Sequence, residues 1–308
     1  MAEEFIAAID LGGTNLKIAL LDLKFRVRHK EVLNTAGFTG RESLISAIVN
    51  SVTGILKENK LNKSSLLGVG LGLPGPIDYK KGIVHFFPNI PGWKHVRLKA
   101  VLQKRLKLPV FIDNDAKVMC LAEYRLGAAA GSKNALCVTL GTGVGGGIII
   151  DGSLYRGSSN AAGEIGHMPI NEKGPRCNCG GYGCLESYVG NKRILEEARK
   201  SFGSGITLEK LSFQAKKRDR KAKRFWARVA QRLSVALTAA TNLLNPDCIV
   251  IGGGVAEAGK ILFDNVKKEI ASRAMKVQAR QVKVLKAKLG ADAGLIGAAI
   301  LVKENFKR

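Results

Sequence analysis

The hydrophobic pattern of the chain contains one unit twice: an apolar run, a short turn rich in glycine and threonine, and a second apolar run. The first copy is FIAAIDLGGTNLKIALLD (5–22), and the second is NALCVTLGTGVGGGIIIDG (134–152). An apolar run that resumes directly after a tight turn predicts a β-hairpin, not a strand that enters a helix. The repetition therefore predicts two lobes, each built around one such hairpin.

A continuous apolar run that ends in glycine follows each hairpin, LLGVGLGLPG at 66–75 and CIVIGGGVA at 248–256. Runs of this kind are typical of strands buried on both faces of a sheet. Helices are predicted at 42–59, 225–245 and 292–306, where apolar residues recur at intervals of three and four. The predicted fold class is therefore α/β, with a duplicated core in two lobes and a central cleft.

The length of 308 residues allows two cores of ordinary domain size. We expect residues 1–116 to form a smaller N-terminal lobe and residues 117–292 a larger one. The last helix, at about 293–308, is expected to pack back on the first lobe. No low-complexity segment separates the lobes, so a tight hinge is expected between them.

The composition, 46% hydrophobic and 24% charged, is typical of a folded globular protein. The start of the chain, MAEEFIAAID, has Glu3 and Glu4 where a signal peptide has basic residues. No apolar stretch approaches the roughly 18 residues that a membrane helix requires. We therefore expect a cytoplasmic protein without a membrane partner.

The formal net charge of +24 is the one unusual bulk property, and it predicts attraction of nucleotides and other polyanions. The densest basic run is KKRDRKAKR, from Lys216 to Arg224, just before a predicted helix. No aromatic residue lies within this run to stack on bases. A solvated helix face is therefore preferred over a nucleic-acid site, and no specific nucleic-acid partner is expected.

The first glycine turn has the chemistry of a phosphate site. Gly12 and Gly13 would let backbone N–H groups approach a phosphate, while Asp10 would hold Mg²⁺ and Thr14 would supply a hydroxyl. An ordinary hairpin turn is the alternative for this segment taken alone. The duplicate turn at 141–143 favours the phosphate site, because two such turns would hold a polyphosphate from both sides.

The second turn also matches the dinucleotide pattern Gly-x-Gly-x-x-Gly, with Gly141, Gly143 and Gly146. That pattern requires a helix directly after the glycines, so that the helix N-terminus meets the pyrophosphate. The residues that follow here predict a strand. The match is therefore interpreted as accidental, and the sequence contains no P-loop of the form GxxxxGK[ST] either.

Two carboxylates follow the strand-like run PVFI (109–112), in the segment Asp113-Asn114-Asp115-Ala116. The carboxyl ends of strands are the place where α/β sheets bind ligands. A carboxylate there that lacks a cationic partner can accept a hydroxyl proton during phosphoryl transfer. The alternative is that Asp113 or Asp115 only caps the next helix.

One histidine and three cysteines, His167, Cys177, Cys179 and Cys184, lie within eighteen residues. Intervening glycines permit sharp turns, so the set suits a tetrahedral His/Cys₃ zinc site. Four protein ligands leave no open coordination position, which predicts a structural Zn²⁺. The remaining cysteines lie in apolar runs and are interpreted as core residues: Cys120, Cys137 and Cys248.

In these motifs the chain resembles the ROK family of repressors and sugar kinases, within the actin-like ATPase superfamily. The resemblance covers nearly the whole chain. The motifs that carry it are DLGGTNLK near the start, GLPGPID (72–78), FPNIPGW (87–93), DNDA (113–116), LGTGVGGGI (140–148), GEIGH (163–167), CNCGGYGCLES (177–187) and IGGGVA (251–256).

The resemblance implies an ATP-dependent kinase with Asp115 as the general base, Mg²⁺ bound with ATP, and structural Zn²⁺ on the four ligands above. His167 could serve both zinc and sugar, one ring nitrogen for each. The implied sugar-binding residues are Gly75, Asn89, Asn114, Asp115, Glu164, His167 and Glu186. The implied nucleotide-binding residues are Asp10, Gly12, Gly13, Thr14, Lys17, Gly141, Thr142, Gly143, Gly253 and Gly254.

The implied reaction is transfer of the γ-phosphoryl group to the 6-hydroxyl of a free hexose. Glucose is the preferred substrate, with N-acetylmannosamine, N-acetylglucosamine, fructose and mannose as alternatives. The chain departs from the family pattern at Lys117, where asparagine is frequent, and at Gly190, where serine is common. Neither departure removes a proposed catalytic group. The resemblance also implies a homodimer or homotetramer.

A sugar-responsive transcriptional repressor is the main alternative, because some relatives bind DNA and this chain is very basic. Such repressors carry a helix-turn-helix domain before the kinase-like part, whereas the first phosphate turn here begins at residue 10. We expect that this leaves no room for the domain. An oxidoreductase is the second alternative. It rests only on the dinucleotide pattern and would predict nicotinamide binding.

Overall fold

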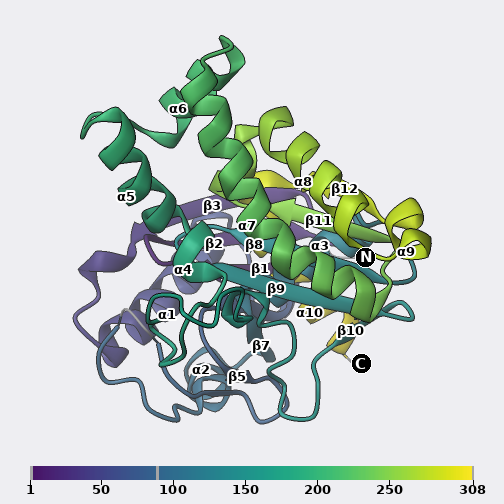
Figure 1. Cartoon of the computed structure of the whole chain (residues 1–308). Coiled ribbons are helices and arrows are strands. Elements are labelled where there is room, and N and C mark those ends of the chain that lie inside the picture. Colours follow the sequence, from purple (N-terminus) through teal and green to yellow (C-terminus); the bar gives the residue numbers. More distant parts are fainter. Residues whose placement is uncertain (1–2, 88–89, 307–308) are drawn as a thin grey trace. The chain divides into compact units, whose positions relative to one another are not determined.

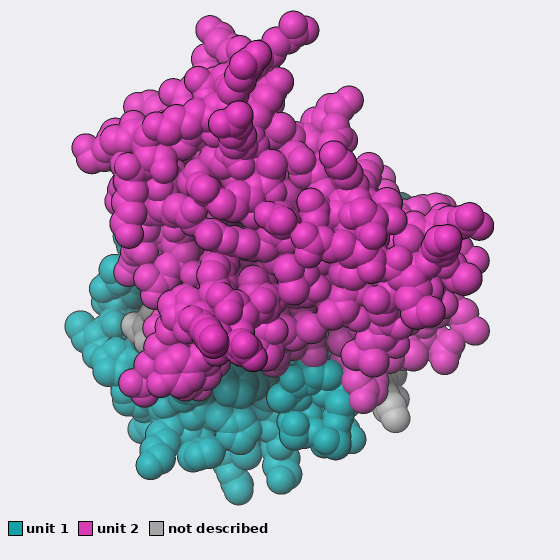
Figure 2. Space-filling view, in the orientation of Figure 1, with its two compact units in different colours: residues 1–122, 156–162, 291–308 teal, residues 123–155, 163–290 magenta. Residues whose placement is uncertain are grey.

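The computed structural model describes residues 3–87 and 90–306. The chain forms two compact units, each made of separate segments and shown in its own colour in Figure 2. The boundary expected near residue 116 lies inside the first segment of unit 1, and the division into domains stays a prediction. Unit 1 comprises Met1–Ala122, Arg156–Ala162 and Ala291–Arg308, and unit 2 comprises Glu123–Tyr155 and Gly163–Gly290.

A five-stranded sheet forms the centre of unit 1, with the strand order β3-β2-β1-β4-β7. The first three strands form an antiparallel meander, and β4 and β7 run parallel to β1. The predicted hairpin at 5–22 is β1 and β2. The strands are β1 (Phe5–Leu11), β2 (Asn15–Asp22), β3 (Val27–Asn34), β4 (Leu66–Leu73) and β7 (Val110–Asn114), with a separate small hairpin of β5 (Ile77–Asp78) and β6 (Ile83–Val84).

Successive residues of β1 are buried in cores on opposite faces of this sheet, as strand geometry requires. Ile9 belongs to a core with Ile48 of α1 (Arg41–Glu58) and with α2 (Leu98–Leu106). Ile6 belongs to a second core with Ala298 of α10 (Ala293–Asn305). The last helix of the chain therefore completes one face of the unit 1 sheet.

Glycines of β4 allow α10 to approach the sheet closely. A Cβ added at Gly70 would lie 2.0 Å from the carbonyl oxygen of Ala298. A Cβ at Gly297 would lie 1.8 Å from the carbonyl oxygen of Val118, in α3 (Asp115–Arg125). Any side chain at either position would push the helix away from its neighbour.

Unit 2 has a sheet of the same design, in the order β10-β9-β8-β11-β12. Again three strands form an antiparallel meander and two run parallel to its first strand. The predicted α/β fold class with a duplicated core is therefore confirmed. The strands are β8 (Ala135–Leu140), β9 (Val144–Ile150), β10 (Ser153–Tyr155), β11 (Cys248–Gly252) and β12 (Lys283–Lys286).

The longest helix of unit 2, α7 (Arg220–Leu244), begins five residues earlier than the sequence predicts. The side chain of Asp219 caps it by accepting the Ala222 N–H at 2.7 Å, so much of the basic run lies on its first turns. Helix α7 lies beside α8 (Lys260–Arg273) (Figure 1). Trp226 of α7 is buried in a core that also contains Leu262 of α8. The other helices are α4 (Glu186–Val189), α5 (Asn191–Phe202), α6 (Leu208–Lys216), α8 (Lys260–Arg273) and α9 (Lys276–Gln281).

The carboxylate of Glu123, in the last part of α3, is fully buried in unit 2. It accepts the backbone N–H groups of Ala128 at 2.7 Å, Lys288 at 2.9 Å and Leu289 at 2.8 Å. Gly127 leaves room for it, because a Cβ there would lie 2.0 Å from Glu123 Oε2. Glu123 thus joins two segments that are far apart in the sequence.

In the described part of the chain, no helix combines the length and the apolar character needed to cross a bilayer.

Candidate active site

Three parallel strands of unit 1 place two groups of predicted site residues on one edge of the sheet. Asp10 of β1 is in register with Gly72 of β4, and Gly72 is in register with Asp113 of β7. Adjacent strands are about 4.8 Å apart, so the backbones of Asp10 and Asp113 are separated by roughly 10 Å. Both lie near the carboxyl ends of their strands, where ligands of α/β sheets bind.

The first glycine turn is held by its own backbone and by Thr35. Gly12 N–H donates to the Asn15 carbonyl at 2.8 Å, and Thr35 N–H donates to the Thr14 carbonyl at 2.9 Å. The Thr35 hydroxyl donates to the Gly12 carbonyl at 3.2 Å. Gly13 and Thr14 at the tip are exposed. The turn is therefore fixed at its base while its tip remains accessible to a ligand.

Asp10 is a partly buried carboxylate next to this turn. Burial raises its pKa, while Lys17, whose Nζ is 3.5 Å from Asp10 Oδ2, opposes the rise. Lys17 also donates to the Ala291 carbonyl at 2.7 Å, which fixes its ammonium group. A Cβ at Gly294 would lie 2.5 Å from Asp10 Cγ, so the glycine makes room for the carboxylate. A carboxylate in this position suits a hard cation such as Mg²⁺.

The two carboxylates at the end of β7 have different surroundings. Asp113 is buried, and its Oδ2 accepts two N–H groups of Arg156, at 3.0 Å from Nε and 2.8 Å from Nη2. Its Oδ1 accepts the Asn114 N–H at 2.8 Å. Asp115 is half-buried at the start of α3, where its Oδ1 accepts the Ala116 N–H at 2.7 Å. Asp113 is thus a structural group paired with a cation.

Asn114 bridges the ends of β4 and β7. Its Nδ2 donates to the Gly75 carbonyl at 3.2 Å, and its Oδ1 accepts the Ala116 N–H at 3.1 Å. Gly75 has φ +81°, and a Cβ there would lie 2.7 Å from the Phe86 carbonyl oxygen, so glycine is required. The structure therefore brings Gly75, Asn114 and Asp115 together. Asn89, a predicted sugar ligand, lies outside the described residues.

In unit 2 the second glycine turn is tied to α4 and α5. Gly141 N–H donates to the Gly143 carbonyl at 3.0 Å, and the Gly141 carbonyl accepts the Asn191 N–H at 2.9 Å. Glu186 Oε2 accepts the Val144 N–H at 2.9 Å. A Cβ at Gly143 would lie 2.4 Å from the same oxygen. Glu186, a predicted sugar ligand, thus lies directly beside the turn that includes Thr142.

The turn after β11 lies next to this second turn. Gly253 has φ +85°, and a Cβ there would lie 2.4 Å from the Leu140 carbonyl oxygen, at the end of β8. Gly254 begins a short 3-10 helix, Gly254–Ala258. The structure therefore brings the predicted nucleotide-binding residues of unit 2, at 141–143 and 253–254, to one edge of the sheet.

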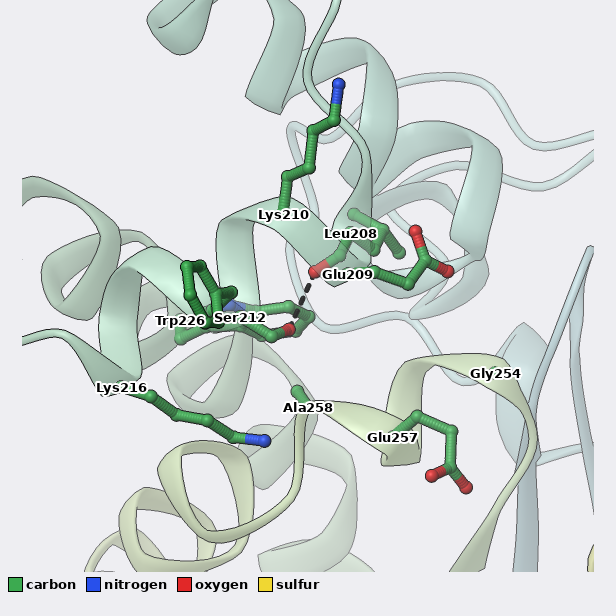
Figure 3. Close-up of a pocket in the computed structure, with 10 residues that line it drawn as sticks. Leu208, Glu209, Lys210, Ser212, Lys216, Trp226, Gly254, Glu257 and Ala258 are labelled. Carbon is green, nitrogen blue, oxygen red and sulfur yellow. Dashed lines mark hydrogen bonds between the residues drawn. The ribbon is translucent and has the colours of Figure 1, made fainter.

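A pocket of about 470 Å³ opens beside Gly254. Figure 3 shows Trp226, Lys216 and Glu257 around it, with Glu209 on the side of α6. The indole N–H of Trp226 is buried and has no hydrogen-bond partner among the described residues. The sequence does not predict this pocket, because α6 and the 254–258 helix meet only in the folded chain.

Glycines in and near the dinucleotide pattern let the 163–167 segment pack closely against 144–146. Residues 144–150 form the strand β9, so the pattern lacks its helix and the predicted accidental match is confirmed. A Cβ at Gly146 would lie 2.4 Å from the Gly163 carbonyl oxygen, and a Cβ at Gly166 would lie 2.0 Å from the Val144 carbonyl oxygen. The segment from Gly163 to His167 therefore lies directly against β9.

This segment ends in the 3-10 helix Ile165–His167. The His167 N–H donates to the Glu164 carbonyl at 3.0 Å. The four predicted metal ligands converge at its end, with ligand atoms all within 4.8 Å of one another. Cys177 Sγ is 3.7 Å from His167 Nδ1, and Cys179 Sγ is 3.7 Å from Cys184 Sγ. His167 therefore faces Cys177 with its Nδ1 atom.

The spacing and chemistry of these ligands fit a tetrahedral zinc ion. Zn–S bonds of about 2.3 Å place sulfur atoms about 3.8 Å apart in a tetrahedron. Burial raises the pKa of the Cys184 thiol to about 12, and hydrogen bonds with Cys179 and Cys177 add to the rise. A backbone hydrogen bond from Gly181 lowers the pKa of Cys179. A bound cation is the partner that would let these thiols ionise together.

A model of the ROK family matches residues 6–305 of the chain. A curated relative, named Glucokinase, from Halalkalibacterium halodurans is 36% identical over 320 residues, which cover 99% of this chain and 97% of the relative.

Two solved structures are similar over almost the whole chain. A ROK family glucokinase from Streptomyces griseus in complex with glucose and AMPPNP has a TM-score of 0.84 at 31% identity, covering 98% of this chain and 100% of that one. A ROK family transcriptional regulator, a homologue of the E. coli MLC protein, has a TM-score of 0.90 at 25% identity, covering 98% of this chain and 78% of the regulator.

Proposed function

The chain belongs to the ROK family, and we propose that it is an ATP-dependent glucose kinase that phosphorylates the sugar 6-hydroxyl. The main structural support for phosphoryl transfer is that Asp10, Gly72 and Asp113 are in register on three parallel strands. This register puts the Asp10 carboxylate, to which we assign Mg²⁺ binding, and the Asn114-Asp115 segment on one edge of a sheet. The choice of glucose rests on the relatives named Glucokinase, of which this chain covers nearly the full length.

In unit 1 we assign Asp115 as the general base that accepts the proton of the sugar hydroxyl as it attacks the γ-phosphorus. Asp113 is unsuited to this role because Arg156 occupies one of its oxygens and the Asn114 N–H the other. Asn114, held by Gly75, would bind a neighbouring sugar hydroxyl. Mg²⁺ near Asp10, when bound, would supply positive charge that offsets the charge of the phosphoryl oxygens.

In unit 2 we assign the backbone of the Gly141–Gly143 turn to the phosphates of ATP. Gly253 and Gly254 would contact the ribose, and the pocket between α6 and Glu257 would take the adenine. Glu164 and the Nε2 atom of His167 would bind sugar hydroxyls. We place the reaction in the cytoplasm.

The direct test is ADP release with ATP and a panel of sugars: glucose, N-acetylmannosamine, N-acetylglucosamine, fructose and mannose. We expect the highest kcat/KM with glucose. Absence of hexose-dependent ADP release with every sugar of the panel would contradict the proposal.

A sugar-responsive regulator is the second candidate, favoured by the TM-score of 0.90 with the ROK family regulator. This candidate predicts glucose binding, measured by titration calorimetry, without ADP release. A glucose kinase gives both signals, so the two measurements together separate the candidates.

We also propose that the four ligands hold a structural Zn²⁺, and we predict its loss when Cys184 is replaced by serine. Metal analysis is expected to find one zinc per chain in the wild type and none in Cys184→Ser. Without the ion, the loop that contains Cys177 and Cys179 loses its cross-link, so limited proteolysis between Glu164 and Glu186 should become several-fold faster. Equal zinc content and equal cleavage in the two proteins would contradict the metal site.

We also propose that copies of this chain associate with one another. Leu243, Met275 and Val277 are exposed apolar side chains with 81%, 64% and 66% exposure, and Asn242 Oδ1 joins the two elements by accepting the Met275 N–H. This surface, at the end of α7 and the start of α9, suits a contact with a second copy of the chain in a homodimer or homotetramer.

A further inference from the structure

The segment Arg156–Ala162 belongs to unit 1, although the residues before and after it belong to unit 2. We call it the strap. Two of its contacts with the rest of unit 1 involve residues that flank the proposed base, Asp115, in the sequence. Two positions before the base stands Asp113, and two positions after it stands Lys117.

The first contact is the ion pair of Arg156 with Asp113. The guanidinium donates twice to Asp113 Oδ2, and it lies over the ring of Tyr79, with Cζ 4.0 Å from the ring centroid. A planar guanidinium held at its edge by a carboxylate and on its face by an aromatic ring has little freedom. Asp113 is 1% exposed, so its carboxylate is removed from water, while the Arg156 side chain is 19% exposed.

In the second contact the cation comes from α3 and the acceptor from the strap. Lys117 extends from α3 to the strap, where its Nζ donates to the Asn160 carbonyl at 2.6 Å. Lys117 is 2% exposed, which is rare for lysine and requires partners for its charge. The strap is therefore hydrogen-bonded to residues that precede and follow Asp115 in the sequence. Arg156 of the strap binds Asp113, and Lys117 of α3 binds the strap.

From these contacts we infer that Arg156 is a positioning residue for phosphoryl transfer, which holds the Asn114-Asp115 segment in place through Asp113. The inference rests on the proposed kinase function. Its physical basis is that Asp113 joins Arg156 on one oxygen to the Asn114 N–H on the other.

Removal of Arg156 leaves a buried carboxylate without its cation. The carboxylate must then move toward water or other donors, and its hydrogen bond to the Asn114 N–H moves with it. A displacement of the base by a fraction of an ångström is enough to slow a reaction that depends on alignment.

The test is Arg156→Met, which keeps an unbranched apolar stem at this position and removes the charge and the N–H donors. We expect kcat to fall 10-fold to 100-fold and the glucose KM to rise several-fold. The ATP KM should stay within twofold, because the groups assigned to the nucleotide lie elsewhere. A role in stability alone would change the fraction of folded enzyme but not this division between the two substrates. Arg193→Met, which breaks an exposed pair with Glu196, is the matched control and should behave as the wild type.

Two further variants keep the inference testable if Arg156→Met folds poorly. Asp113→Asn combined with Arg156→Met removes both charges, and we expect at least a fivefold higher kcat than in Arg156→Met alone. Arg156→Lys keeps the charge but lacks the planar group that donates twice to Asp113 Oδ2. Its kcat should lie between those of the wild type and Arg156→Met. A glucose kinase whose Arg156→Met and Arg156→Lys variants both keep wild-type kcat and glucose KM would overturn the inference. A wild type that does not phosphorylate glucose would instead overturn the proposed function.

Discussion

Replacing Asp115 with asparagine is expected to lower kcat for glucose phosphorylation about 10³-fold and to leave glucose affinity within a fewfold of the wild type. Removal of a general base costs roughly 10²–10⁴ in rate. Asparagine has the same shape as aspartate, and its amide oxygen can still accept the Ala116 N–H. The sugar-binding surface should therefore stay intact while the proton acceptor is lost.

The measurement is ADP release at saturating ATP and glucose, with glucose binding followed by calorimetry. Asp151→Asn is a suitable control, because the Asp151 side chain is 70% exposed and forms a surface ion pair with Lys133. Its kcat should equal that of the wild type. An Asp115→Asn enzyme with more than a tenth of the wild-type kcat would remove Asp115 from the role of base.

The second large effect concerns stability. Replacing Glu123 with alanine is expected to lower the free energy of unfolding by roughly 3–5 kcal/mol, because three backbone N–H groups lose their acceptor inside the protein. Glu123→Gln retains one oxygen but turns the other position into a donor. We expect it to cost less than alanine and more than 1 kcal/mol.

Urea unfolding followed by circular dichroism gives these free energies. Glu196→Ala is the control, since Glu196 forms an exposed ion pair with Arg193, and its effect should stay below about 0.5 kcal/mol. If Glu123→Ala unfolds at the same urea concentration as Glu196→Ala, the three buried hydrogen bonds contribute little to the free energy of unfolding, and the prediction is wrong.

The features that the sequence predicts well are local. The hairpins β1–β2 and β8–β9 follow from apolar runs around a glycine turn, and the duplicated sheet follows from their repetition. The four metal ligands converge as their spacing suggests, because all but His167 lie within eight positions. In each case the signal and the structure involve the same short stretch of chain.

The features that the sequence does not predict depend on contacts between distant segments. Nothing near Arg156 indicates that it pairs with Asp113, and nothing near Glu123 indicates that it binds the backbone at Lys288. Ion pairs and buried carboxylates have no periodicity along the chain. The early start of α7 is not evident from the sequence for another reason. Its first turn is basic and exposed, so apart from Ala222 it has no apolar residue that would extend the helical pattern.

The order of synthesis gives α10 a further importance. Ile6 and Ala8 are made among the first residues of the chain, whereas their core partners Leu295 and Ala298 are made among the last. One face of the unit 1 sheet must therefore remain uncovered while nearly all of unit 2 is translated, and such a face is a site for aggregation or chaperone binding. A chain that stops before α10 would keep that face open permanently.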